Sequence, residues 1–175
     1  DEVFGLFDAV TRSLSVPLCV YDNPATTHFE FSDELHGRIA QLPNVASIKI
    51  PGVPADPEAA RTRVDRLRAL IPQHVTIGVS GDAFAATGLN AGCEAWYSVI
   101  AGLFPQIALA ITRNAQTGNV REATGLSGRL APLWALFLQY GSLRVIATAA
   151  ELRGLVATPC LPLPVRSLQG EVRQR

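Results

Sequence analysis

The chain has 175 residues, enough for one globular domain with a sizeable core, and 48% of them are hydrophobic. Its formal net charge is zero, and no apolar run is long enough to cross a membrane, so composition favours neither nucleic acid nor a membrane as a partner. The three cysteines, Cys19, Cys93 and Cys160, are odd in number and far apart, which fits free thiols in a reducing cytoplasm.

The first part of the chain shows a helix, a strand and a second helix. Residues 1–14 carry apolar side chains at helical spacing. Residues 17–21 form a continuous apolar run, typical of a strand buried on both faces of a parallel sheet. A loop follows, and Ser32 is a suitable N-cap for a helix over residues 32–42.

Three further strands are expected, each followed by a helix. The strands cover residues 45–50, 75–79 and 95–99. The helices begin at Asp56-Pro57, at Asp82 after the turn Ser80-Gly81, and near Phe104. Beyond residue 118 no strand is expected. Two helices, over residues 119–141 and 142–154, lead to a segment rich in proline.

Strands and helices thus alternate four times with short connections, which predicts a right-handed parallel α/β sheet. Periodicity alone leaves two architectures open, a section of a barrel and an open doubly wound sheet. No GxGxxG or GxxxxGK[ST] segment follows any strand, so a nucleotide-binding version of the open sheet has no support.

Lys49 is the only lysine among the 15 basic residues, and the remainder are arginine. Arginine keeps its proton in proteins, whereas a desolvated lysine can lose it, so lysine alone suits the work of an amine nucleophile. Lys49 stands between Ile48 and Ile50, and we expect these apolar neighbours to favour the neutral amine.

The segments around this lysine carry a family resemblance. YDNPATT, at residues 21–27, and SIKI, at 47–50, are similar to the paired YNxP and [GA]xK motifs of the dihydrodipicolinate synthase / N-acetylneuraminate lyase family. VSGD, AWYSVIAGLFP and GLVATPCLPLP resemble that family in order and spacing. The resemblance covers the whole chain but only the second half of the family's barrel. It implies a TIM (β/α)8 barrel, with its last four βα units in residues 1–118 and a C-terminal helical segment in 119–175.

The resemblance also implies a chemistry, that of class I aldolases and lyases acting on pyruvate or another 2-oxo acid. Lys49 would form the Schiff base, and Tyr21 would relay protons. Gly81 and Tyr97 would line the pocket for the oxo acid, and Thr26 and Thr27 would contact the aldehyde. No metal or organic cofactor is implied, and the family suggests a homo-oligomer, a dimer or tetramer, in the cytoplasm.

Two departures from the family pattern affect the choice of substrate. Dihydrodipicolinate synthases hold the aldehyde's carboxylate with an arginine where this chain has Thr26, so we expect a neutral, hydroxylated aldehyde instead. Ile50-Pro51-Gly52 also replaces the usual acidic or small polar run after the lysine. Two alternatives stay open: a dehydratase of a sugar-derived 2-oxo acid on the same fold, and a non-catalytic paralogue that acts in binding or assembly.

Overall fold

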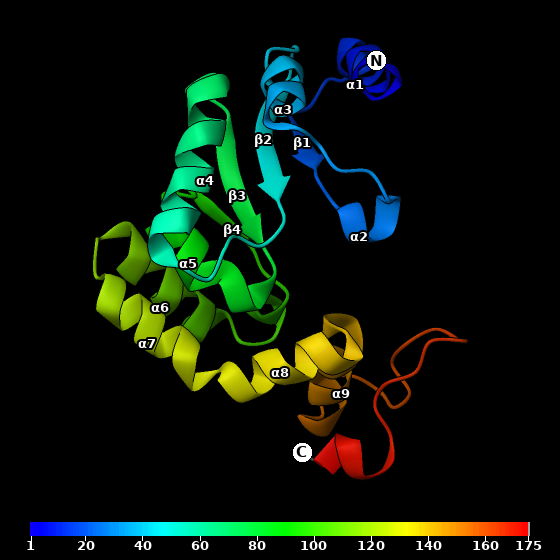
Figure 1. Cartoon of the computed structure of the whole chain (residues 1–175). Helices are drawn as coiled ribbons and strands as arrows, with labels where there is room; N and C mark the ends of the chain where they lie inside the picture. The colour runs from blue at the N-terminus through cyan, green and yellow to red at the C-terminus, as the bar shows by residue number, and fades with distance from the viewer. Residues whose placement is uncertain (175) are drawn as a thin grey trace.

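Four parallel strands form one sheet in the order in which they occur along the chain (Figure 1). The computed structural model describes residues 1–174. The strands are β1 (Leu18–Tyr21), β2 (Val45–Ile50), β3 (Thr76–Ser80) and β4 (Ala95–Tyr97). A doubly wound sheet would reverse direction at a switch point, whereas this order runs without reversal, as in a barrel wall.

A helical segment follows each strand, which confirms the predicted alternation. After α1 (Glu2–Ser13), the sheet is covered by α3 (Asp33–Ala40), α4 (Pro57–Leu70), α5 (Ala85–Asn90) and α6 (Pro105–Gln116), with short 3-10 turns η1 (Asp82–Phe84) and η2 (Ile100–Gly102). Two of the predicted caps are present. Ser32 Oγ accepts from Leu35 N at 3.1 Å, and Asp56 Oδ1 accepts from Ala59 N at 2.8 Å.

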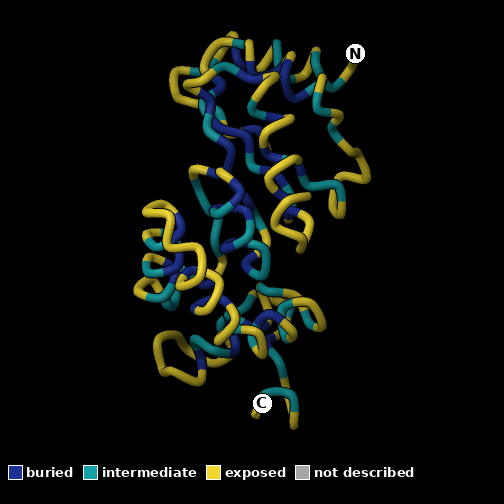
Figure 2. The backbone as a smooth tube through the Cα atoms, turned by 60° about the vertical axis from the view of Figure 1, so that its left-hand side comes forward, coloured by how far each residue is buried: buried dark blue, intermediate teal, exposed yellow. Residues whose placement is uncertain are grey.

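The two faces of the sheet differ in character. Val20, Ile48, Ile77 and Val79 are fully buried against the helices and form the centre of the core (Figure 2). Side chains alternate along a strand, so Cys19 and Tyr21, on either side of Val20, point to the opposite face and are exposed. The prediction that the first strand is buried on both faces is therefore wrong, because the helices cover one face only.

The C-terminal region departs from the sequence prediction at one point. The single helix expected over residues 119–141 is two helices, α7 (Val120–Arg129) and α8 (Ala131–Tyr140). Pro132 explains the break, because proline lacks an N–H and fits only the first turn of a helix. The helix α9 (Ser142–Leu152) begins after Gly141, whose φ of 82° favours glycine.

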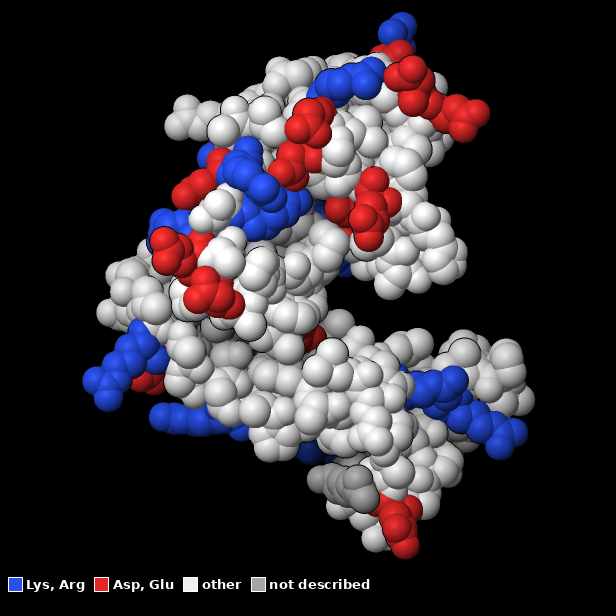
Figure 3. Space-filling view, viewed as in Figure 1, with Lys and Arg blue, Asp and Glu red and all other residues white. Residues whose placement is uncertain are grey.

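The C-terminal helices pack against the helices that cover the sheet and continue beyond the carboxyl ends of the strands (Figure 1). Ala123 and Leu126 of α7 share a buried cluster with Leu89 and Ile111 of α5 and α6. The helix α8 then passes below the carboxyl ends of the strands, and a hollow separates the two, as the right-hand side of Figure 3 shows. The expected boundary near residue 118 falls in the turn between α6 and α7, and a division into two domains stays a prediction.

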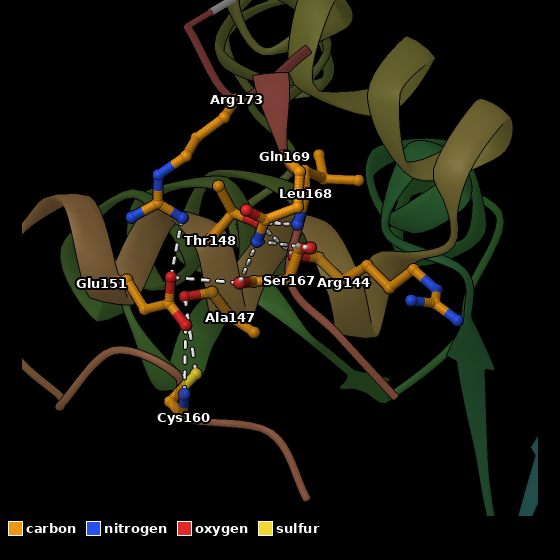
Figure 4. Close-up of polar contacts among 9 residues, drawn as sticks. All are labelled: Arg144, Ala147, Thr148, Glu151, Cys160, Ser167, Leu168, Gln169 and Arg173. Atoms are coloured by element: carbon orange, nitrogen blue, oxygen red, sulfur yellow. Dashed lines mark hydrogen bonds and ion pairs between the residues drawn. The ribbon is translucent and has the colours of Figure 1, made fainter. Parts of the chain in front are cut away.

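The last part of the chain is fastened to α9 through one buried carboxylate (Figure 4). Glu151 accepts hydrogen bonds from Cys160 N at 3.0 Å, Ser167 Oγ at 3.1 Å and Arg173 Nη1 at 2.6 Å. The Arg173 guanidinium lowers the pKa of Glu151 to about 2. The tail, which ends in the 3-10 turn η3 (Gly170–Gln174), is therefore held by a charge-assisted contact. Within residues 1–174, no helix is both long enough and apolar enough to span a membrane.

Candidate active site

Four of the predicted site residues meet at the carboxyl ends of the strands. Tyr21 pairs with Lys49 across β1 and β2, and Ser80 pairs with Tyr97 across β3 and β4. A cavity of about 260 Å³ between the sheet and α8 is lined by the four predicted residues, Tyr21, Lys49, Gly81 and Tyr97, and by Ser80. In barrels of this architecture the active site lies at this end of the strands.

Lys49 lies between two aromatic rings. Its Nζ is 3.8 Å from the centroid of the Tyr21 ring and 5.4 Å from that of Tyr97. Ile48 and Ile50 are buried on the opposite face of the sheet, so the expectation that isoleucines surround the amine is wrong. The rings instead fix where the amine lies and offer their π faces to it.

Tyr97 forms the floor of the cavity beneath Lys49. Its Oη is 2.8 Å from Ser47 Oγ and accepts a hydrogen bond from Cys19 Sγ at 3.1 Å. The ring lies over Gly78, where a Cβ would come within 2.3 Å of it. Burial, and then the Cys19 contact, raise the pKa of the Tyr97 phenol, so it is neutral at physiological pH. The Tyr97 side chain thus shapes the site.

The turn after β3 brings a buried carboxylate beside the cavity. Gly81 has a φ of 79°, a conformation that favours glycine. The next residue, Asp82, accepts from Ser98 Oγ at 3.1 Å and from Val99 N at 3.0 Å. Burial raises the pKa of the Asp82 carboxyl. Asp82 therefore joins the loop after β4 to the loop after β3.

Comparison with known proteins identifies the family to which the chain belongs. Residues 1–175 match the model of the dihydrodipicolinate synthetase family. The chain belongs to this family. It is 31% identical over 174 residues to the 4-hydroxy-tetrahydrodipicolinate synthase of Synechococcus elongatus, covering 98% of this chain and 56% of that protein. It is 28% identical to the enzyme of the same name from Methanothrix thermoacetophila, covering 99% of this chain and 57% of the relative.

The crystal structure of a dihydrodipicolinate synthase from Agrobacterium tumefaciens superposes with a TM-score of 0.90 at 43% identity. It covers 99% of this chain and 57% of that structure. The chain therefore has the TIM-barrel fold of the dihydrodipicolinate synthetase family and spans little more than half the length of these relatives. The expected barrel is confirmed, and the open doubly wound sheet is excluded.

Two expected substrate contacts lie elsewhere in this family member. Thr26 and Thr27 belong to a short helix, α2 (Pro24–Thr27), where the sequence indicated an irregular loop. Thr26 Oγ1 accepts from Asn23 Nδ2 at 3.0 Å, and Thr27 Oγ1 donates to Asn23 O at 3.0 Å. Neither residue lines the cavity over Lys49. Their hydroxyls stabilise their own turn, and a role in binding the aldehyde stays a prediction.

Behind Tyr21 lies a buried polar pair that the sequence did not reveal. His36 is fully buried, stacks on Phe31 at 4.9 Å, and its Nε2 is 3.6 Å from Asp22 Oδ2. Burial lowers the pKa of His36 to about 4 and raises that of Asp22. Asp22 N also donates to Lys49 O at 3.0 Å, so the pair supports the strand ends that carry both predicted catalytic residues.

The thiols and histidines do not form a metal centre in the described part of the chain. No group of three or more potential ligands lies close together within residues 1–174. Cys19, Cys93 and Cys160 are all free thiols. At the cavity, the Lys49 amine lies beside the rings of two tyrosines, an arrangement that suits addition to a carbonyl group.

Proposed function

We propose that this chain supplies the lysine-bearing half of a class I aldolase, which joins pyruvate or another 2-oxo acid to an aldehyde or cleaves the product. The position of Lys49 carries the proposal, because the only lysine of the chain lines the cavity, with its Nζ 3.8 Å from the centroid of the Tyr21 ring. The relatives are nearly twice as long. We therefore assign catalysis to the completed barrel, in which a preceding half closes the sheet.

Each step of the proposed reaction uses groups that the cavity holds. The neutral amine of Lys49 attacks C2 of the oxo acid, a C–N bond forms, and the carbonyl oxygen leaves as water. The resulting protonated imine withdraws electrons, so C3 loses a proton and an enamine forms. The enamine carbon then bonds to the aldehyde carbon, whose oxygen takes up a proton. Water finally hydrolyses the imine, which releases the product and restores the amine.

We assign the transfer of these protons to Tyr21. A phenol can donate and accept a proton at one oxygen, and the Tyr21 ring is the aromatic group nearest to Lys49 Nζ. The protonated imine acts as its own electron sink, so the scheme needs neither a metal nor an organic cofactor. A homo-oligomeric assembly and a cytoplasmic location stay predictions.

Reductive trapping tests this function. The completed barrel is made by joining the first half of the Agrobacterium relative to this chain, and it is incubated with pyruvate and borohydride. Peptide mapping by mass spectrometry should place the adduct on Lys49. Lys49→Arg keeps the charge but should abolish the adduct, because a guanidinium does not form the imine. An adduct only at another amine, or none at all, would overturn the proposal. The chain alone serves as a control, and we expect it to associate through the unpaired edges of β1 and β4 and to lack turnover.

A further inference from the structure

We infer that the aldehyde partner carries an apolar, uncharged chain. This inference rests on the proposed function, since it takes the cavity above Lys49 as the place where the aldehyde binds. It differs from the hydroxylated aldehyde that the sequence indicates. Three features of the cavity support it: three of its polar side chains already have hydrogen-bond partners, its outer wall is apolar, and the threonines expected to bind hydroxyls lie elsewhere.

Three of the polar side chains that line the cavity, those of Ser80, Asp82 and Tyr97, already have hydrogen-bond partners. Lys49 is consumed in the imine. Ser80 Oγ donates to Ile50 O at 2.8 Å, and the Asp82 carboxylate already accepts from Ser98 and Val99. Lys49 is also the only cationic side chain among the described residues that line this cavity. A carboxylated aldehyde would therefore find no second cation here once the imine has formed.

The outer wall of the cavity is built from large apolar side chains. They come from the segment after β3, the loop after β4 and helix α8, and they are Phe84, Val99, Trp134, Phe137 and Leu138. Trp134 and Phe137 pack with their centroids 5.7 Å apart. The indole Nε1 donates to Ser127 O at 3.0 Å, so it has no bond left for a ligand. The walls of the hollow visible in Figure 3 are accordingly mostly uncharged.

Leu138 is unusual on this wall because 76% of its surface is exposed. A leucine at the rim of a cavity provides apolar area that a ligand can cover, and covering such area favours binding. A polyhydroxylated chain in the same place would give up its bonds to water without replacing them. Thr26 and Thr27 cannot compensate, because they lie outside the lining and bond to their own turn.

The test compares three four-carbon aldehydes on the completed barrel, after pyruvate trapping on Lys49 has been measured. Butanal represents the apolar class, erythrose the polyhydroxylated class and succinic semialdehyde the carboxylated class. With pyruvate as the partner, kcat/KM per free aldehyde should be about tenfold or more higher for butanal than for either competitor. A higher value for erythrose or succinic semialdehyde, with trapping intact, overturns this inference and leaves the proposed function standing. If nothing is trapped, both fail.

A pair of variants locates the effect. Leu138→Asp places a charge on the apolar wall, and the ratio of kcat/KM for butanal over erythrose should fall about tenfold. Leu143→Asp is the matched control, because Leu143 is 57% exposed, lies on the neighbouring helix α9 and does not line the cavity. Its ratio should stay that of the parent. Equal shifts in both variants, or none in Leu138→Asp, would show that α8 does not select the aldehyde.

Discussion

Replacing Gly78 with alanine should push the Tyr97 ring out of the floor beneath Lys49. The new Cβ would lie 2.3 Å from Tyr97 Cε2 and 2.7 Å from Cδ2, far inside van der Waals contact. Gly78 is held by the β3 ladder opposite Lys49, so the backbone cannot retreat and the ring has to move. A displaced ring loses its contact with Ser47 and changes the surroundings of the amine.

The expected cost follows from three contributions. Overpacking a filled site costs about 1–3 kcal/mol. Losing the hydrogen bond between Tyr97 and Ser47 costs about 1 kcal/mol more. Alanine in a strand regains about 0.5–1 kcal/mol relative to glycine. The free energy of unfolding of the completed barrel should therefore fall by about 2 kcal/mol, and trapping of pyruvate on Lys49 should slow.

Urea unfolding of a double-mutant cycle measures this coupling. In a Tyr97→Ala background the added methyl group meets no ring, so Gly78→Ala should be neutral or stabilise by about 0.5 kcal/mol. The coupling energy should then be roughly 2 kcal/mol. Gly125→Ala is the matched control, because a Cβ at this glycine of α7 has no neighbour within 4 Å, and its effect should be the same in both backgrounds. If Gly78→Ala lowers the free energy of unfolding equally with and without the Tyr97 ring, then that ring does not pack on Gly78.

Three further predictions concern single residues. Tyr21→Phe should lower kcat by about 10²-fold or more while the melting temperature changes by only a few degrees, as enzyme assays and calorimetry would show. The free energy of unfolding should fall by roughly 3 kcal/mol between pH 6.5 and pH 4, because the unfolded chain takes up a proton that buried His36, with a pKa of about 4, does not. The raised pKa of Asp22 has the opposite effect, because it increases the free energy of unfolding as the pH falls. Denaturation of the parent and of His36→Gln at a series of pH values separates the contribution of the histidine. Glu151→Gln should raise the rate of amide hydrogen exchange in residues 160–173 by about tenfold or more. In the parent, the contact between Glu151 and Arg173 is fully present above pH 4.5 and is lost only as the pH falls toward 2, because the Glu151 carboxyl has a pKa of about 2.

Each of these has an outcome that would contradict it. A Tyr21→Phe variant that loses stability and turnover in parallel would indicate a structural hydroxyl. An unfolding free energy as dependent on pH in His36→Gln as in the parent would place the titration elsewhere. Unchanged exchange in the tail of Glu151→Gln would mean that Arg173 and Ser167 do not depend on the carboxylate.

The order of strands and helices follows from local signals, which is why sequence predicted it well. Ser32 and Asp56-Pro57 define helix starts through their own side chains and need no distant partner. Whether the second face of a strand is buried depends instead on distant parts of the chain. The run ending in Cys19-Val20-Tyr21 is apolar throughout, yet only Val20 meets the helices. The break at Pro132 was missed because the apolar pattern continues on both sides of it.

For a related reason, the sequence predicts only some of the residues that form the candidate site. Lys49 and Tyr21 stand out through residue type and family spacing, and strand register then brings them together. The floor depends on the contact between Tyr97 and Ser47, which lie 50 positions apart in the chain. This contact forms only when β2, β3 and β4 are aligned in register and when Gly78 leaves room for the Tyr97 ring. The Asp22–His36 pair depends in turn on how α3 packs against β1. No spacing along the chain encodes such contacts.

Ile48 and Lys49 are neighbours in the chain, yet Ile48 is buried against the helices and Lys49 faces the cavity. Successive residues of the same strand therefore alternate between packing against the helices and lining the cavity. A residue on the cavity face, such as Ser47, contacts Tyr97 and not the helix-covered core that contains Ile48. Substitutions on the cavity face can thus change what the cavity offers to a ligand, while the side chains that pack against the helices stay the same.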